Sequence, residues 1–289
     1  MRFIKKFVKN QIIKVCKCLG ETSPLLLDFS TIEDGKNASY LLDSMRTARF
    51  LEPKELQAPE NKKVLIIAPH PDDEVIGMGG VLSQMVKNGC DVNVIYLTFG
   101  ADESAKEEAL KSADFLGYNC THFFDFLPRN IVFDNKVLLA FSNVISQTRP
   151  EIIFIPFMLD DHDDHRRASE LLLKIYEEGM LLETQDIQIW AYQVYTALPL
   201  NVAINITAVI DKKIEAINCY SSRFSQRNWA HFAKGLNAFN VRYLSGNTKK
   251  DYAELFLQVS LPNYLKMCST YFRNSTDQCY TTKLYNKKP

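Results

Sequence analysis

Residues 64–74 constrain the fold of this chain more than any other part of its sequence. Residues 64–68, VLIIA, are five apolar or small residues that predict a buried strand, and the sequence PHPDDE follows directly. One imidazole and three carboxylates are costly to place at the end of a buried strand unless a cation or a reaction uses their charge. We therefore expect this strand to lead into a loop with a chemical function.

A second cluster of acidic and imidazole side chains follows another apolar run. Residues 152–156, IIFIP, lead to the sequence DDHDDH at positions 160–165. The carboxyl ends of parallel strands lie at one edge of a sheet, and ligands of α/β proteins bind there. Together, the two clusters predict one metal site that is built from two loops of an α/β sheet.

Apolar runs alternate with helical periodicity along most of the chain. Such alternation predicts βαβ units, and therefore an α/β fold in which helices flank a mainly parallel sheet. The content of hydrophobic residues, 46%, is sufficient for a large core. Strands are expected at 64–68, 92–98, 121–126, 152–156, 187–195 and 202–207, and helices at 75–88, 104–116, 135–148, 166–178, 211–224 and 250–259.

The spacing within the two clusters indicates which side chains hold the metal. His70 and Asp73 lie three residues apart at a turn, and His162 and His165 lie three apart on a helical turn. Two histidines and one carboxylate suit a catalytic Zn²⁺, and the same ligands also suit Fe²⁺ and other divalent ions. We expect His70, Asp73 and His165 to be the ligands.

The clusters hold more polar side chains than a metal ion needs, which favours catalysis. Asp72, next to a ligand, is the expected general base for a water molecule. His162 is expected to bind the developing oxyanion, and Asp164 to hold the His162 imidazole in orientation. Each cluster alone has a plainer interpretation, as surface histidines or as a helix N-cap, and their joint occurrence favours the site.

Other polar and aromatic residues give weaker signals. His122 and His231 lie outside the clusters and are expected to be structural. The Tyr- and Phe-rich C-terminal third is expected to form core and not a surface for ring stacking. The seven cysteines form no CxxC pair, which is typical of the reduced thiols of a cytoplasmic protein. Lysine plus arginine equals aspartate plus glutamate, 34 each, so the chain has no overall charge that favours nucleic acid.

The first twenty residues are basic and amphipathic. They contain no apolar run of the ~18 residues that a membrane span needs, and no signal-peptide pattern. A helix that packs on the body of the protein is the favoured interpretation, and peripheral contact with the inner face of an anionic membrane is the alternative. We expect residues 1–60 to be a lead-in and residues 61–289 to form the catalytic domain.

The two clusters resemble the motifs of a known family. The APHPDDE sequence, followed by GMGG at positions 77–80, is similar to the first motif of the PIG-L (LmbE-like) zinc-dependent de-N-acetylases, and HDDHR at 162–166 is similar to the second. The resemblance spans roughly residues 62–257. Further matches are Leu97, Thr98, Gly100, Glu108, Leu116, Gly117, residues 213–216, residues 220–222, residues 252–254 and Phe256.

The resemblance implies a Rossmann-like sheet and hydrolysis of an N-acetyl group from an amino-sugar derivative. It implies zinc ligation at His70, Asp73 and His165, general-base catalysis by Asp72, and oxyanion or proton-transfer work by His162. These roles agree with those inferred from the spacing.

Several positions depart from the family pattern. Many relatives carry an arginine that helps to hold the sugar at the position of Ala105, and the loop between Thr98 and Glu108 is short. Asp163 replaces the usual proline, and Asp160 stands where some relatives have a catalytic tyrosine. The resemblance therefore leaves the identity of the substrate open.

The sequence thus predicts a zinc-dependent hydrolase acting on a small N-acetylated sugar, such as a nucleotide- or lipid-linked intermediate of glycan biosynthesis. One alternative is hydrolysis of another amide or acyl bond on a non-sugar scaffold. Another is a metal- or ligand-binding module without catalysis. Asp72 beside a full ligand set argues against the second alternative, because a structural metal needs no additional base.

Overall fold

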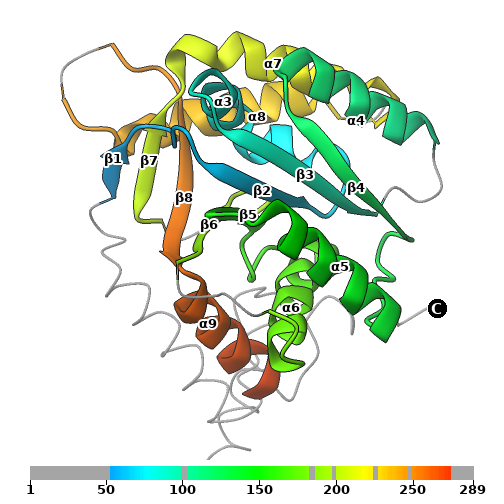
Figure 1. Ribbon diagram of the computed structural model, residues 1–289. Coiled ribbons are helices and arrows are strands. Elements are labelled where there is room, and N and C mark those ends of the chain that lie inside the picture. The colour runs from blue at the N-terminus through cyan, green and yellow to red at the C-terminus, as the bar shows by residue number, and fades with distance from the viewer. Residues whose placement is uncertain are drawn as a thin grey trace, which may run out of the picture.

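An eight-stranded sheet with helices on both faces forms the body of the molecule (Figure 1), here a computed structural model that describes residues 53–98, 103–181, 186–196, 200–223, 227–246 and 249–274. The strands are β1 (Lys54–Leu56), β2 (Lys63–Ala68), β3 (Asp91–Thr98), β4 (Asn119–Phe126), β5 (Ile152–Pro156), β6 (Gln188–Tyr192), β7 (Val202–Asn205) and β8 (Ala253–Ser260). The longer helices are α3 (Asp73–Lys87), α4 (Glu103–Leu116), α5 (Asn135–Thr148), α6 (Asp163–Glu177), α7 (Ile210–Asn218), α8 (Trp229–Asn240) and α9 (Leu261–Asn274).

The strand order is β1-β7-β8-β6-β5-β2-β3-β4. All neighbouring strands run parallel except β8, which pairs antiparallel with both β6 and β7. The predicted class, a mainly parallel α/β sheet flanked by helices, is confirmed. Among the described residues, no helix is long and apolar enough to span a membrane.

Each face of the sheet has its own hydrophobic core. Figure 1 shows α3, α4, α7 and α8 over one face and α5, α6 and α9 over the other. Met78 of α3 and Ile217 of α7 belong to the first core, whereas Phe141 of α5 and Leu171 of α6 belong to the second. Because both faces are covered, the central strands β2, β5 and β6 are apolar over most of their length, as in other parallel sheets.

The topology reverses between β2 and β5. Strand β2 pairs in parallel with β3 on one side and with β5 on the other. After β2 the chain builds the sheet outward through β3 and β4, and it then returns to place β5 on the opposite side. In open α/β sheets such a switch point leaves a crevice at the carboxyl ends of the two strands, where ligands bind. Both acidic clusters leave the sheet at this point.

The prediction of a helix at residues 250–259 is wrong. Residues 253–259 belong instead to β8, which lies inside the sheet between β7 and β6. Leu255 and Leu257 pack into one core and Phe256 packs into the other, which is the alternation of a strand. The apolar run at residues 255–257 lies between Glu254 and Gln258 and is too short for hydrophobic periodicity to separate a buried strand from a helix.

Other boundaries also differ from the expectation. The helix expected at 211–224 ends at Asn218, and a short 3₁₀ turn follows at Ser221–Arg223. Helices α8 and α9 were not predicted. Within the expected lead-in, β1 pairs with β7 at the edge of the sheet. The basic segment at residues 1–20 lies outside the described residues.

Helix α3 is bent, and a buried ion pair supports the bend. Met78 has φ −146° and ψ 21°, which are not helical values. The following Gly80 and Val81 N–H groups donate to the two carboxylate oxygens of Glu254 on β8, at 2.9 and 2.7 Å. Lys213 on α7 donates to the same carboxylate at 2.7 Å, and both side chains are fully buried. A carboxylate at this position stabilises the positive end of the second helical segment.

Glycine at position 77 is required by the close approach of α3 to the sheet. A Cβ atom on Gly77 would lie 2.4 Å from Cδ2 of Tyr192 on β6. The Tyr192 ring is fixed because its hydroxyl donates to the carbonyl of Ile67 on β2, at 2.9 Å. The absence of a side chain therefore brings the first turn of α3 close to the carboxyl end of the central strands.

Candidate metal and catalytic site

The first cluster occupies the tight connection between β2 and α3. His70 lies in this connection, and Asp73 is the first residue of the helix. The N–H and the hydroxyl of Thr98 both donate to the carbonyl of Pro69, at 2.8 and 2.9 Å, and so fix the start of the loop to β3. Asp72 has φ 117°, which residues other than glycine rarely adopt. Such strain costs ~1–3 kcal/mol and concentrates at functional sites.

The second cluster forms the N-terminal turn of α6. His162 is the N-cap, and its side chain accepts the Asp164 N–H. His165 is fully buried one turn later. Because β2 and β5 are adjacent and parallel, the N-termini of α3 and α6 meet at the same edge of the sheet.

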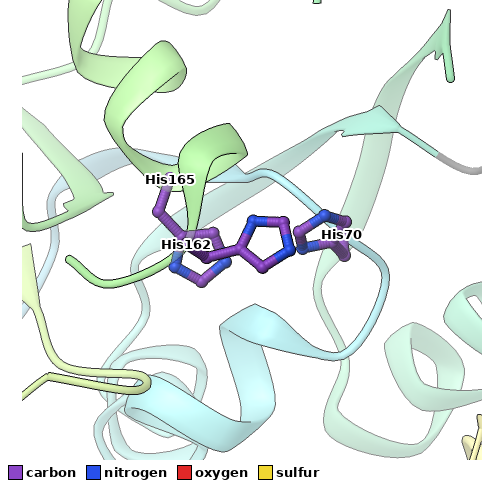
Figure 2. A group of neighbouring side chains, drawn as sticks. All are labelled: His70, His162 and His165. Carbon is purple, nitrogen blue, oxygen red and sulfur yellow. The ribbon is translucent and has the colours of Figure 1, made fainter. Parts of the chain in front are cut away.

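The three histidines converge on one point, as Figure 2 shows. His70, His162 and His165 each offer a ring nitrogen that lies within 4.8 Å of the others. Oδ2 of Asp73 lies 3.0 Å from Nδ1 of His70 and 3.1 Å from Nε2 of His165. The structure therefore brings together all three expected ligands, and His162 lies close enough to be a fourth candidate.

The state of the buried polar atoms fits a metal ion. Oδ1 of Asp73 and both ring nitrogens of His165 are buried without a hydrogen-bond partner. Carboxylate oxygens lie 3.0 and 3.1 Å from the two His165 nitrogens, but neither contact has hydrogen-bond geometry. A buried polar atom without a partner costs ~1–3 kcal/mol. A divalent cation ligated by imidazole nitrogen and carboxylate oxygen would satisfy these atoms.

The electrostatics of the cluster also favour a cation. Burial alone would lower the pKa of His165, but the charge of Asp73 and the contact with Asp160 outweigh burial and raise it to about 10. Burial likewise opposes protonation of His70, and the Asp73 charge together with the Asp164 contact raises its pKa to about 9. The carboxylates thus create a field that binds positive charge at this point.

His162 differs from the other two histidines. Burial and the neighbouring imidazoles lower its pKa to about 4, so the ring is neutral at neutral pH. Its Nδ1 accepts the N–H of Asp164 at 3.2 Å. The proton of the neutral ring therefore sits on Nε2, as inferred from this hydrogen bond. A ring with Nε2–H is a hydrogen-bond donor, which suits an oxyanion better than a metal ion.

The carboxylate of Asp164 makes contacts that the sequence did not indicate. It lies 3.9 Å from Nδ1 of His162, whereas its Oδ2 lies 2.9 Å from Nε2 of His70. The backbone N–H of Arg129 donates to both carboxylate oxygens, at 3.0 and 2.9 Å. The backbone N–H of Asp164 donates to His162 and holds its ring. Orientation of the His162 ring by the Asp164 carboxylate stays a prediction.

Asp160 is a functional candidate to which the sequence assigned no role. Its side chain is 1% exposed, and Oδ1 lies 3.0 Å from Nδ1 of His165. Oδ2 accepts the N–H groups of Tyr195 and Thr196 in the β6–β7 connection, at 3.2 and 3.3 Å. A carboxylate on the far nitrogen of a metal-binding histidine orients that ligand. The position of Asp160 within an acidic cluster was the available signal.

Glu74 supports the first loop from inside the protein. Its carboxylate accepts hydrogen bonds from the hydroxyls of Tyr118 and Tyr220, the first at 2.9 Å and the second at 2.5 Å. It also accepts the N–H of Asp72 at 3.2 Å, and so holds the strained residue in place. Burial raises the pKa of Glu74 despite these hydrogen bonds.

Ala105, the position that departs from the family pattern, is fully buried on α4. The rings of His122 and His231 contact Phe124 and Phe232, and neither histidine is among the three that converge at the site.

Comparison with known proteins yields a family and several relatives. A family model described as GlcNAc-PI de-N-acetylase (PIG-L) matches residues 65–176, which include both clusters. Diacetylchitobiose deacetylase of Thermococcus kodakarensis is 30% identical over 209 residues, covering 63% of this chain and 78% of the relative. The 4-oxalmesaconate hydratase of Pseudomonas putida is 24% identical over 211 residues, covering 63% and 80%.

The solved structures include a similar fold. N,N′-diacetylchitobiose deacetylase from Pyrococcus horikoshii, in complex with its inhibitor MPG, superimposes with a TM-score of 0.58 at 22% identity. The superposition covers 83% of this chain and 97% of that structure. At this identity the likeness supports the fold.

Proposed function

Because this chain belongs to the PIG-L family of deacetylases, we propose that it hydrolyses the N-acetyl group of an amino-sugar derivative and releases acetate. The observation that carries this proposal is the convergence of His70, Asp73 and His165, with Asp72 and His162 beside them, at the switch point of the sheet. The proposed substrates are nucleotide- or lipid-linked N-acetylated sugars.

Zn²⁺ is the proposed metal, and His70, Asp73 and His165 are its proposed ligands. When bound, a divalent ion supplies Lewis-acid polarisation of the amide carbonyl and lowers the pKa of a water molecule. The unpartnered atoms of Asp73 and His165 support this assignment, and so does the Nδ1 hydrogen bond that makes His162 a donor. Asp160 would keep the His165 ring in its ligating orientation.

Asp72 is the proposed general base. Its carboxylate takes a proton from the attacking water and then carries the proton that the departing amine requires. The strained backbone of Asp72, whose N–H donates to Glu74, supports a functional role for this residue. The Nε2–H of His162 donates to the oxyanion as the carbonyl becomes tetrahedral.

The test is acetate release from a panel of free, nucleotide-linked and lipid-linked N-acetylhexosamines by the zinc-loaded protein. Asp72→Ala should lower turnover by at least ~10²-fold, which is the usual contribution of a general base to the rate. A chelator should abolish release, and zinc should restore it. Asp161→Ala is the matched control, because Asp161 is exposed in the same cluster.

Near-normal turnover of Asp72→Ala would contradict the role of Asp72. Absence of acetate release across the panel would favour another substrate. Two observations would then favour a substrate without a sugar. One is the similarity to a hydratase, and the other is alanine at position 105, where many relatives carry the arginine that helps to hold the sugar.

A further inference from the structure

Three aromatic side chains continue outward from the histidine cluster. The ring of Tyr195 stacks at 29° on His165, with 5.3 Å between ring centroids. Trp229 lies 5.5 Å from Tyr195, and Phe232 lies 5.9 Å from Trp229. Tyr195, Trp229 and Phe232, here called the aromatic strip, connect the candidate catalytic site to the surface.

The aromatic strip is exposed although it is apolar. Tyr195 is 43% exposed and Phe232 is 54% exposed, while Trp229 is half-buried. Single exposed aromatic residues are common on protein surfaces, but a contiguous run of them beside a reactive site is characteristic of a ligand-binding surface. Tyr220, Phe256 and Tyr264 of the C-terminal third are buried, as expected for core, whereas Tyr195 and Phe232 are exposed.

Backbone hydrogen bonds hold both parts of the strip. The Tyr195 N–H donates to Oδ2 of Asp160, whose Oδ1 contacts the metal-ligand candidate His165. Trp229 and Phe232 lie three residues apart on the first turn of α8, where the Asn228 side chain caps the helix. The strip is therefore fixed in position relative to the histidines, as preorganised binding requires.

Polar side chains border the strip. The Arg227 guanidinium lies 5.9 Å from the centre of the Trp229 ring, and the His231 ring lies 6.0 Å from that of Phe232. Arg227 and His231 are both exposed. A sugar ring has an apolar C–H face and a rim of hydroxyl groups, and it matches an aromatic surface with hydrogen-bonding groups at its edge.

Two other occupants fit this chemistry less well. An alkyl chain has no groups that use the polar border. A planar base is held best between parallel rings, whereas successive rings of the strip meet at 74° and 66°. A puckered sugar ring can rest on a single aromatic face.

We propose that Tyr195, Trp229 and Phe232 form a subsite for a second sugar ring, the one linked to the N-acetylated sugar at the histidine cluster. This inference rests on the proposed deacetylase function. It narrows the substrates proposed above to those in which a second sugar unit is joined directly to the N-acetylated one, whatever carrier follows. The strip is the surface that distinguishes such an oligosaccharide from a free monosaccharide.

The test compares wild-type protein with Trp229→Ala on four substrates: N-acetylglucosamine, N,N′-diacetylchitobiose, a uridine diphosphate derivative and an octyl glycoside of N-acetylglucosamine. The ratio of kcat/KM for the disaccharide to kcat/KM for the monosaccharide should fall roughly tenfold, which corresponds to a lost contact of about 1.4 kcal/mol. The loss should appear mainly in KM.

Phe239→Ala is the matched control for this test. Phe239 is an exposed aromatic residue of α8, 59% exposed, with its own contact to Arg242. This variant should keep the wild-type ratio. An equal loss on all substrates, or a selective loss on the nucleotide or octyl derivative, would overturn the proposed subsite.

Fluorescence separates failure of the subsite from failure of the deacetylase function. Trp229 and the buried Trp190 are the two tryptophans of the chain. If the wild-type protein releases no acetate, a change in emission on titration with the disaccharide that is absent from Trp229→Phe would still support the sugar subsite. No change in emission and no acetate release would overturn both proposals.

Discussion

A single carboxylate, that of Asp160, connects the metal-ligand candidates to the aromatic strip. One oxygen lies against the ring of His165, and the other holds the backbone of Tyr195 and Thr196. The hydrogen bonds and the contact with His165 hold the pKa of Asp160 below its usual range in spite of burial, so the group is ionised at neutral pH. We therefore propose that Asp160 is a positioning residue for the site.

Replacement of Asp160 by asparagine should weaken metal binding. An amide keeps the shape of the side chain but loses the charge that orients and polarises His165. Loss of such an outer partner typically lowers metal affinity by about 10–100-fold. Zinc titration against a competing chelator measures the effect. Asp161→Asn makes the same change at an exposed neighbour and should leave the affinity intact; an equal loss in both variants would argue against the role of Asp160.

At the scale of single residues, the sequence could indicate which side chains belong to the candidate site but not which backbone groups contact them. The candidate ligands were identifiable because imidazoles and carboxylates at the ends of apolar strands carry their chemistry in the residue type. The amide of Arg129, which binds the carboxylate of Asp164, has no such signal, since every residue except proline offers an N–H group. The contact of Asp164 with His70 likewise depends on how the two loops fold together.

At the scale of elements, the bend in α3 depends on the buried pair of Lys213 and Glu254. Glu254→Gln removes the charge that compensates Lys213 in a fully buried position. Breaking one side of a buried ion pair costs about 3–5 kcal/mol. Urea unfolding should therefore show a large loss of stability. The double variant with Lys213→Met has no uncompensated charge and should be more stable than Glu254→Gln alone. A double variant that is less stable would contradict this account.

The stabilising contribution of Glu55 on the edge strand β1 should depend on pH. Lys250 donates to both carboxylate oxygens of Glu55, at 2.6 and 2.8 Å, and lowers the pKa of this group below 4.5. A carboxyl group with a lower pKa in the folded protein stabilises the fold above its unfolded pKa, and this contribution is lost as the pH falls through the folded pKa. The free energy of unfolding of wild-type protein should exceed that of Glu55→Gln at pH 7 by up to ~1 kcal/mol.

The difference for Glu55 should shrink below pH 4.5, which urea unfolding at several pH values can measure. Glu60→Gln is the control, because Glu60 is an exposed carboxylate near the same strand. A difference that is independent of pH would exclude the ion pair as its cause.

Helices and strands were predictable where the spacing of their apolar residues matches the face that they bury in the folded protein. The strand at 152–156 and the helix at 135–148 were expected with the bounds that the structure has, because their apolar period matches the face they bury. The sequence pattern does not identify β8 as a strand, because insertion between β6 and β7 buries both of its faces and removes the alternation of apolar and polar residues. Helix α8 exposes Phe232 and Phe239, which weakens the apolar stripe on which such a prediction depends.

At the scale of the whole molecule, the switch point between β2 and β5 collects the charges of both clusters. Asp73, Asp160 and Asp164 are each at most 1% exposed and lie against the histidines. Three carboxylates in a shared buried site repel one another unless positive charge is present. Because this site joins the two loops that fix α3 and α6 to the sheet, occupancy by a cation should couple to the stability of the entire domain.

Zinc should therefore raise the melting temperature of the metal-free protein. At a free concentration of 100 times Kd, a ligand that binds only the folded state adds about 2.7 kcal/mol, or roughly 5 °C in Tm for a domain of this size. Differential scanning calorimetry after chelation and zinc addition measures the shift. Asp73→Asn should lose it, whereas Asp72→Asn and His162→Gln should retain it, since neither residue is a proposed ligand. Loss of the shift in His162→Gln together with its retention in Asp73→Asn would instead assign the ion to the three histidines.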